Sequence, residues 1–450
     1  MTLGCQVVRL VPSAILGAQP AGPLRGVAPT PRALSFHTEV IAESDHAGMN
    51  DDEWRPGAAQ SPAARTISRR HWMGTALAVP VAASLGARSA GAQGVAGGPL
   101  HVGFVIDSAG PVVDASRDLF TGAKVHFDDL GARGQLRGLR ISQRLADGTP
   151  ARTRDAVLAL SRQDRVDVIV GPVGDAALLT LLEDPAFEAE GVPLVGPWSG
   201  VAGNHSLVGR QVFFTRPDYQ REMSYLREYL ATLGMSEFGL VWAPALPAAV
   251  VQSVRAGAVQ RAPGPPSATV TTQVDLSADA ADWAPLLGRL AQRRPPAIVV
   301  VGDSVAYTQV FLLLKRLTPG ALVVGLSMVN PRTVQELVPP AQMAGAVLTQ
   351  VTPSPIRLNL PVVRELDRAM KRFFDEPASH QTLSGYIAAQ LILAAQRRSD
   401  GPGRERMRKA LADTRSVDLG GFALRYGGES PRGSGFVDVL LMRANGQLMQ

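Results

Sequence analysis

Cysteine is nearly absent from this chain of 450 residues, whose single cysteine is Cys5. Cys5 falls in an N-terminal segment that we expect to be removed, so the mature chain would have no thiol. Disulfide bonds, cysteine-ligated metals and thiol catalysis are therefore excluded for it. Histidine is scarce as well, and neither a metal nor another cofactor is expected. The histidines that follow residue 92 stand at no metal-ligand spacing: His101, His126, His205 and His380.

The sequence also lacks the short motifs of common enzyme and nucleotide-binding classes. It has no Gly-x-Ser-x-Gly elbow, no Walker loop, and no Gly-x-Gly-x-x-Gly that follows a strand. Gly302-Asp303-Ser304 after an apolar run looks like the Ser block of a secreted esterase family. The Asp-x-x-His that would complete such a triad is missing from the end of the chain. We therefore expect no catalytic residue, and a secreted hydrolase is the less favoured alternative.

Charge of one sign is not concentrated anywhere in the sequence. The formal net charge is +6, and no basic run with interleaved aromatic residues occurs, so nucleic acid is not an expected partner. Hydrophobic residues make up 46% and charged residues 19%, which is typical of a globular protein. The length is sufficient for two lobes with cores of their own.

The first 92 residues read as an export leader. Arg69 and Arg70 lie in a segment, 68–74, that resembles a twin-arginine signal, and a short apolar run over 75–85 follows. Small residues at 90–92 suit signal cleavage, which places the signal in residues 66–92. A start at Met49 would give a leader of usual length and leave residues 1–48 untranslated. The apolar run is too short for a membrane span, so a soluble periplasmic protein is expected.

Beyond residue 99 the chain alternates short β-branched runs with helical stripes. Such alternation predicts parallel sheets covered by helices on both faces. The pattern occurs in two sets of similar size, and two α/β lobes that face each other across a cleft are the simplest arrangement. The predicted strands are 101–106, 140–145, 166–170, 192–195, 238–242, 268–274, 297–301, 321–326 and 346–350.

The most informative stretch is the strand 166–170 with the turn that follows it. Gly174, Asp175 and Ala176 open a helix there, and ligands bind at such carboxyl edges of open sheets. Asp175 could contact a ligand or could simply cap its helix. Trp198 could be a wall of the cleft or a core plug. The other candidate ligand-binding residues also follow predicted strands: Ser108, Ser199, Gly200, Ser304 and Ser327.

Eight blocks, taken in order over residues 100–450, resemble one protein family. It is the periplasmic solute-binding proteins of the branched-chain amino-acid (leucine-binding) type, which serve ABC importers. One block is Val168-Ile169-Val170-Gly171-Pro172, which resembles the family's third strand edge. The blocks are 102–111, 120–123, 168–172, 191–197, 350–355, 361–365, 384–389 and 419–422.

The resemblance implies a type I periplasmic binding protein fold, with two doubly wound parallel-sheet lobes joined by a three-strand hinge. Lobe I would comprise residues 99–216 and 346–413, and lobe II would comprise residues 217–345 and 414–450. The protein would be a monomer that captures a small polar or amino-acid-like solute in the interlobe cleft and delivers it to a membrane permease. A periplasmic ligand-sensing domain of the same fold is the alternative.

The residues that would recognise an amino acid depart from the family's pattern. Asp175 stands where a small hydroxyl residue usually holds the ligand carboxylate, and an ionised aspartate would repel that group. Trp198 takes the place of a small residue, and Ala115 that of a wall tyrosine. Pro247 and Ser304 stand at wall positions of lobe II, and Ser327 or Met328 where a carboxylate for the ammonium group is expected. The sequence therefore argues against a plain leucine or valine ligand.

Overall fold

The computed structural model describes residues 99–201, 205–259, 266–276, 282–374, 376–427 and 430–449. The predicted leader, with its twin-arginine motif and the proposed start at Met49, lies outside the described residues. Within the described ranges, no helix is long and apolar enough to cross a membrane.

The first sheet is parallel and has the strand order β2-β1-β3-β4-β5. Its strands are β1 (Leu100–Asp107), β2 (Leu139–Ala146), β3 (Val168–Val170), β4 (Leu194–Val195) and β5 (Val212–Phe213). Alternate residues of β3 point into different cores, because Val168 and Val170 belong to one apolar cluster and Ile169 to another. A short β-branched run without polar alternation is what a strand covered on both faces requires.

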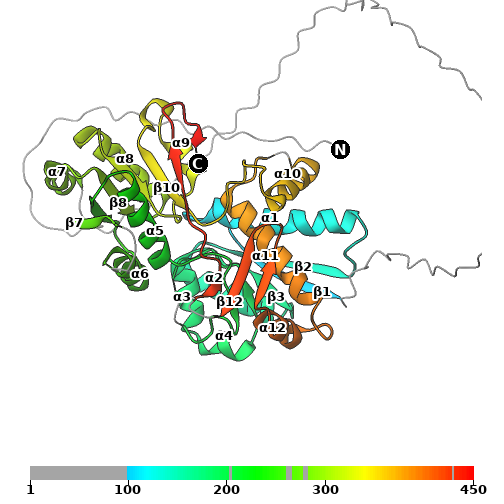
Figure 1. Ribbon diagram of the computed structural model, residues 1–450. Coiled ribbons are helices and arrows are strands. Elements are labelled where there is room, and N and C mark those ends of the chain that lie inside the picture. Colours follow the sequence, from blue (N-terminus) through cyan, green and yellow to red (C-terminus); the bar gives the residue numbers. More distant parts are fainter. Residues whose placement is uncertain are drawn as a thin grey trace, which may run out of the picture. The chain divides into compact units, whose positions relative to one another are not determined.

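Helices cover the two faces of this sheet. On one face lie α1 (Val113–Ala132), α10 (Pro361–Phe373), α11 (His380–Gln396) and α12 (Arg404–Ala412), whose apolar residues share a cluster with Val168 and Val170. On the other face lie α2 (Pro150–Arg162), α3 (Asp175–Leu182) and α4 (Pro185–Glu190). Figure 1 shows α11 alongside α1. Their backbones meet closely, since a Cβ on Gly122 would lie 1.8 Å from the carbonyl oxygen of Thr382.

The second sheet has the order β15-β14-β10-β9-β8-β6-β7. Its strands are β6 (Glu237–Trp242), β7 (Thr269–Asp275), β8 (Ala297–Val301), β9 (Leu322–Gly325), β10 (Ala346–Gln350), β14 (Asp438–Met442) and β15 (Leu448–Met449). The pairs from β7 to β10 are parallel, while β14 joins β10 antiparallel and β15 joins β14 antiparallel.

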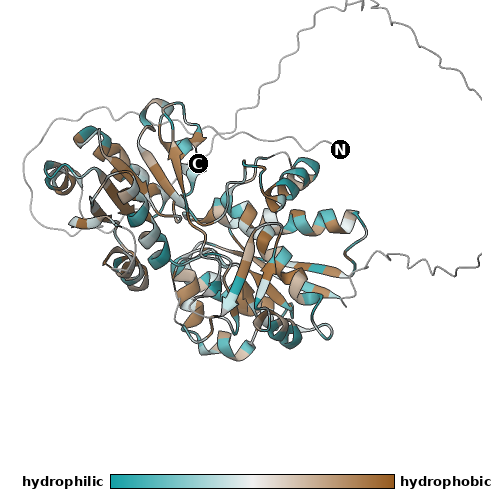
Figure 2. Cartoon of the chain, viewed as in Figure 1, coloured by the Kyte–Doolittle hydropathy of each residue, from teal (hydrophilic) through white to brown (hydrophobic). Residues whose placement is uncertain are grey.

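Helices also lie on both faces of the second sheet. Figure 2 shows apolar strands between helices whose outer sides are hydrophilic. One face packs against α5 (Tyr219–Thr232) and α6 (Ala248–Val259), and the other against α7 (Ala284–Gln292), α8 (Ser304–Leu317) and α9 (Pro331–Leu337). The prediction of two α/β lobes with doubly wound sheets is confirmed.

The lobe boundaries differ from the expected ones at two places. We expected residue 346 to begin the return to lobe I, but β10 pairs with β9 and β14, so the chain crosses back only after Gln350. We expected the segment from residue 414 onwards to lie in lobe II. Instead a small antiparallel sheet of β11 (Ser416–Asp418), β12 (Ala423–Gly427) and β13 (Ser430–Gly433) follows, and Leu419, Phe422 and Leu424 belong to the lobe I core.

Three segments therefore connect the lobes. They follow β5, β10 and β13, and lead to α5, α10 and β14 respectively. Below, lobe I means the first sheet with its helices and the small sheet, and lobe II means the second sheet with its helices.

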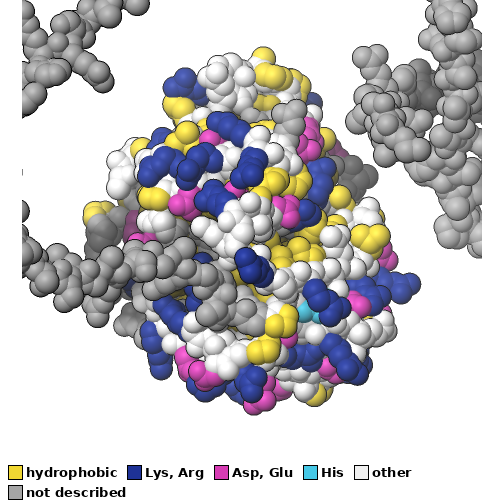
Figure 3. Space-filling view, turned by 90° about the vertical axis from the view of Figure 1, so that its right-hand side faces the viewer, with side chains coloured by type: hydrophobic (Ala, Val, Ile, Leu, Met, Phe, Trp, Pro, Cys, Tyr) yellow, Lys and Arg dark blue, Asp and Glu magenta, His cyan; other side chains and the backbone are white. Residues whose placement is uncertain are grey.

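The surface that Figure 3 displays carries Lys and Arg side chains in several separate groups, with acidic and apolar side chains between them. On this face the positive side chains therefore form no single continuous patch.

Candidate functional site

A cavity of about 450 Å³ lies where the loops that follow the parallel strands of both lobes come together. Lobe I contributes the loops after β1, β2, β3 and β4, and lobe II contributes those after β6, β8 and β9. This is the carboxyl edge of each sheet, where open α/β folds bind ligands.

The cavity brings together some of the residues predicted from the sequence and leaves others out. Those that line it are Gly174, Asp175, Ala176, Trp198 and Ser304, together with Ala115 and Pro247 of the expected wall and Met328 of the expected ammonium position. Four predicted residues lie outside the lining: Ser108, Ser199, Gly200 and Ser327. Ser108 is exposed and donates its hydroxyl hydrogen to the carbonyl of Ala146, at 2.8 Å, which ties the β1 and β2 ends together.

Asp175 does not act as a conventional helix cap. The N-cap residue of α3 is Gly174, which has a positive φ of 103° and makes no side-chain cap bond. The carboxylate of Asp175 instead accepts hydrogen bonds from Ser199 Oγ at 2.7 Å and from the Gly200 backbone N–H at 3.1 Å, both at Oδ1. Its Oδ2 accepts the hydroxyl of Tyr219 at 2.8 Å. Asp175 therefore links α3 to the loop after β4 and to the first residue of α5.

Tyr219 connects the two lobes at the back of the cavity. It begins α5, after the N-cap residue Asp218, and its ring is 1% exposed. Burial, then the charge of Asp175, raises the pKa of Tyr219 well above its ordinary value, so its hydroxyl remains a hydrogen-bond donor. The bond between Tyr219 and Asp175 is thus a direct contact between lobe II and lobe I.

Trp198 lies in the cavity wall and is also almost wholly buried, at 5% exposed. The sequence allowed Trp198 to be either a wall of the cleft or a core plug, and the residue has features of both. The guanidinium of Arg216 lies 5.0 Å from the centroid of the Trp198 ring and 5.3 Å from that of Tyr219. Cation–π contacts of this kind hold both rings in place against the cavity.

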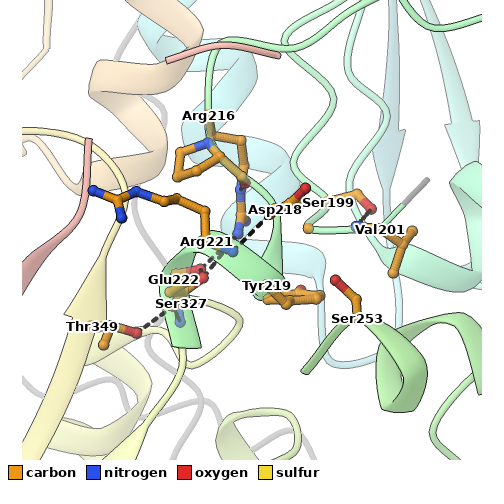
Figure 4. Close-up of polar contacts among 12 residues, drawn as sticks. Ser199, Val201, Arg216, Asp218, Tyr219, Arg221, Glu222, Ser253, Ser327 and Thr349 are labelled. Carbon is orange, nitrogen blue, oxygen red and sulfur yellow. Dashed lines mark hydrogen bonds and ion pairs between the residues drawn. The ribbon is translucent and has the colours of Figure 1, made fainter. Parts of the chain in front are cut away.

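Arg216 belongs to a buried ion-pair network at the first crossing between the lobes, shown in Figure 4. Its Nη2 donates to Glu222 at 3.3 Å and to Ser327 Oγ at 2.8 Å. Glu222 also accepts the Ser327 backbone N–H at 2.6 Å, the Ser327 hydroxyl at 2.8 Å, and the hydroxyl of Thr349. Ser327, in the loop after β9, is 0% exposed, and both its hydroxyl and its backbone N–H belong to this network. It therefore does not line the cavity.

Arg432 connects the interlobe segment that follows β13 to the one that follows β5. It extends from β13, is 2% exposed, and its guanidinium donates to the backbone carbonyls of Ser199, Val201 and Arg216. The guanidinium carbon also lies 3.6 Å from the centroid of the Phe214 ring. Burial lowers the pKa of Arg432 to about 9, which leaves the group charged at neutral pH.

The polar groups on the lobe II side of the cavity come from the starts of α8 and α9. Asp303 caps α8 by accepting the N–H of Ala306 at 2.9 Å. Ser304 Oγ accepts the N–H of Asn330 at 2.9 Å. The Gly-Asp-Ser block that suggested an esterase therefore serves two helix starts. His380, at the start of α11, forms a hydrogen bond of 3.0 Å between its Nδ1 and Thr352 Oγ1.

The sequence analysis did not single out several cavity residues, among them Tyr219, Asn330 and Gln381. Each stands at a helix start: Tyr219 directly follows the cap Asp218, Asn330 is the cap of α9, and Gln381 is the second residue of α11. A search for polar residues at every helix start would have included them among the candidates. Their assembly around one cavity depends on how the lobes are joined, which the sequence pattern does not reveal.

The charges in the lining are of one sign. Asp175 and Asp303 line the cavity, and none of the described lining residues is Lys, Arg or His. Most of the remaining lining is apolar, including the loop 243–247 and the side chains of Pro111, Val112 and Val305. Among the described residues, no group of three or more His, Cys, Asp or Glu is placed to hold a metal ion.

Comparison with known proteins gives a consistent result. Residues 99–447 match the family model described as periplasmic binding protein. No curated protein matches the chain significantly.

Among solved structures, an extracellular ligand-binding receptor from Verminephrobacter eiseniae has a TM-score of 0.68 at 21% identity, over 78% of this chain and 100% of that one. A substrate-binding periplasmic protein from Ralstonia solanacearum has a TM-score of 0.66 at 24% identity, over 78% and 99%. A branched-chain amino acid transporter substrate binding protein from Streptococcus pneumoniae, in complex with isoleucine, has a TM-score of 0.65 at 16% identity, over 78% and 98%. At these identities the likeness establishes the fold alone, which is the type I periplasmic binding protein fold.

Proposed function

This chain belongs to the periplasmic binding protein family, and we propose that it is a solute receptor that captures a small molecule between its lobes and delivers it to an ABC importer. The observation that supports this most strongly is the cavity itself, because both lobes line it with the loops that follow their parallel strands. A ligand that contacts both lobes stabilises the arrangement in which they are close together. The structural neighbours include proteins described as ABC transporter substrate-binding proteins.

The proposed role requires binding and release without a chemical step. We infer that the protein is not an enzyme, because Asp303 and Ser304 are engaged at helix starts and His380 lies against Thr352. Export through the twin-arginine signal and life as a monomer in the periplasm belong to the same proposal. Fractionation of cells that lack the twin-arginine translocase should leave the protein in the cytoplasm, and its appearance in the periplasm there would refute this route.

The proposal is tested by binding to the full-length chain. A thermal-shift panel of amino acids, amides, carboxylates and aromatic acids should contain a compound that raises the melting temperature. Trp198→Ala should weaken that compound's binding at least about tenfold, since it removes a wall of the cavity. Trp283→Ala is the matched control, because Trp283 precedes α7 outside the lining and its loss should change the affinity less than about twofold.

One result would contradict the receptor role, and a second would contradict the assignment of the ligand to this cavity. One is the absence of any thermal shift across the panel together with hydrolysis of p-nitrophenyl esters. The other is equal loss of binding in the Trp198 and Trp283 variants, which would place the ligand outside this cavity. For delivery to an importer, a strain without the gene should lose uptake of the bound compound.

A further inference from the structure

We propose that the cavity selects an uncharged solute with a hydrogen-bonding head, of the primary amide class, and discriminates against carboxylates. This inference rests on the proposed receptor function and concerns the same cavity. It follows from three features of the described residues: the bonds made by Asp175, the charges of the lining, and the unsatisfied side chain of Gln381.

The carboxylate of Asp175 already accepts three hydrogen bonds at the lobe I edge. The hydroxyl of Ser199 and the N–H of Gly200 both donate to its Oδ1, at 2.7 and 3.1 Å, and the hydroxyl of Tyr219 donates to its Oδ2 at 2.8 Å. The side chain also stands in the first turn of α3, where the helix dipole favours a negative charge. Asp175 is therefore the anion that these three donors bind, and a ligand carboxylate would find them occupied.

No positive charge in the lining compensates a second anion. The charged lining residues are Asp175 and Asp303, and the described part of the lining contains no Lys, Arg or His. Arg216 lies behind Trp198 and Tyr219, is 1% exposed, and is paired with Glu222. Arg432 is equally buried, and its three nitrogens donate to backbone carbonyls. A carboxylate in the cavity would meet like charge without a partner, which disfavours binding.

Gln381 offers a site for a donor. It comes from the start of α11, lines the cavity and is 1% exposed, yet its Oε1 has no hydrogen-bond partner in the part of the chain that the structure describes. A buried acceptor without a partner is costly, and a rotation of this side chain toward the cavity would bring the oxygen within reach of a ligand N–H. On the opposite wall, the oxygen of Ser304 accepts from Asn330, so its hydroxyl hydrogen is left to donate. A carboxylate can only accept, whereas an amide both donates and accepts.

The apolar part of the lining fits the remainder of such a molecule. Pro244, Leu246, Pro247, Val305 and Met328 come from lobe II, and Val112, Val173 and Trp198 come from lobe I. A compact alkyl or aryl group of an amide would be buried between these walls. An ammonium ligand would suit the two aspartates electrostatically, but it would leave the donor of Ser304 without an acceptor, so amides are favoured.

The test is calorimetric titration of the full-length chain with matched pairs of equal shape. The pairs are isovaleramide with isovalerate and phenylacetamide with phenylacetate, and isoamylamine supplies the cationic arm. We expect the better amide to bind at least tenfold more tightly than its carboxylate and than the amine. Equal or tighter binding of a carboxylate, or of the amine, would overturn the amide assignment and leave the receptor function standing.

Variants of Asp175 and Asp303 test whether Asp175 causes the discrimination against carboxylates. Asp175→Ser removes the charge and frees Ser199, Gly200 and Tyr219, so it should improve carboxylate binding at least tenfold. Asp303→Asn separates the two effects, because it removes the other lining carboxylate without freeing those donors, and its gain for carboxylates should be at least threefold smaller than that of Asp175→Ser. Asp175→Asn, which keeps the shape of the side chain, should give an intermediate gain and serves if the serine variant does not fold.

Each remaining outcome refutes a different part of the proposal. A folded Asp175→Ser or Asp175→Asn chain with no gain for carboxylates would overturn the role assigned to Asp175. If no amide, carboxylate or amine binds to the wild type or to any variant, and the wider thermal-shift panel is also empty, the receptor function itself fails. If the wider panel contains a ligand without an amide or comparable uncharged head, only the ligand class fails.

Discussion

Glu222 provides a sharp test of what holds the two lobes together. It is 0% exposed, and its carboxylate accepts hydrogen bonds from Arg216, from the N–H and hydroxyl of Ser327, and from Thr349. These partners come from the first crossing, the loop after β9, and β10. The network thus joins three segments that are distant in the sequence, as Figure 4 shows.

Glu222→Ala should lower the free energy of unfolding by about 3–5 kcal/mol. The variant leaves Arg216 as a buried cation without its counter-charge, and removing one partner of a buried ion pair typically costs about this much. The Nη1 of Arg216 already lacks a hydrogen-bond partner among the described residues, so the guanidinium has little with which to compensate. Urea unfolding of the full-length chain, followed by circular dichroism, measures the change.

The double variant Glu222→Ala/Arg216→Met separates the pair from the rest of the network. Because it removes both charges, its loss should be at least about 1 kcal/mol smaller than the sum of the two single losses. Glu228→Ala is the control on the same helix, and it should cost no more than about 0.5 kcal/mol because Glu228 is only half-buried. A loss below about 1 kcal/mol for Glu222→Ala, or additive single losses, would refute the account of the network.

Two further predictions concern stability. Burial lowers the pKa of His380 from 6.5 to about 4. Between these two values the unfolded chain binds a proton at His380 that the folded chain does not bind. The free energy of unfolding therefore falls as the pH drops from 6.5 to 4. Unfolding at pH 7 and 4.5 should show this contribution as about 2 kcal/mol, absent from His380→Asn, and equal pH slopes for the two proteins would contradict it. Gly122→Ala should cost at least about 2 kcal/mol, because the new Cβ would lie 1.8 Å from the Thr382 carbonyl oxygen. Gly131→Ala in the same helix meets nothing within 4 Å and should raise stability by about 0.5–1 kcal/mol, and similar melting temperatures for the two variants would refute the close contact of α1 with α11.

The sequence was informative wherever the cause of a structure is local. A short β-branched run such as the one that contains Val168 and Ile169 is suited to a strand buried on both faces, whatever the neighbouring strands are. The turn that ends this strand, and the helix that Asp175 begins, could be located for the same reason. The family resemblance could be seen in these local blocks, and residues 99–447 match the family model.

Only the tertiary structure decided which strands and side chains are partners. β10 has the pattern of any buried strand, and its place beside β9 and β14 depends on non-local hydrogen bonds. Asp175 could equally have capped its own helix, but Ser199, Gly200 and Tyr219 reach it from 24, 25 and 44 residues away in the sequence. The sequence by itself therefore determined the strands, helices and edges, because period and turn chemistry are properties of neighbouring residues. The folded chain alone determined what the cavity can bind, because hydrogen-bond donors and charges from segments far apart must first be brought together.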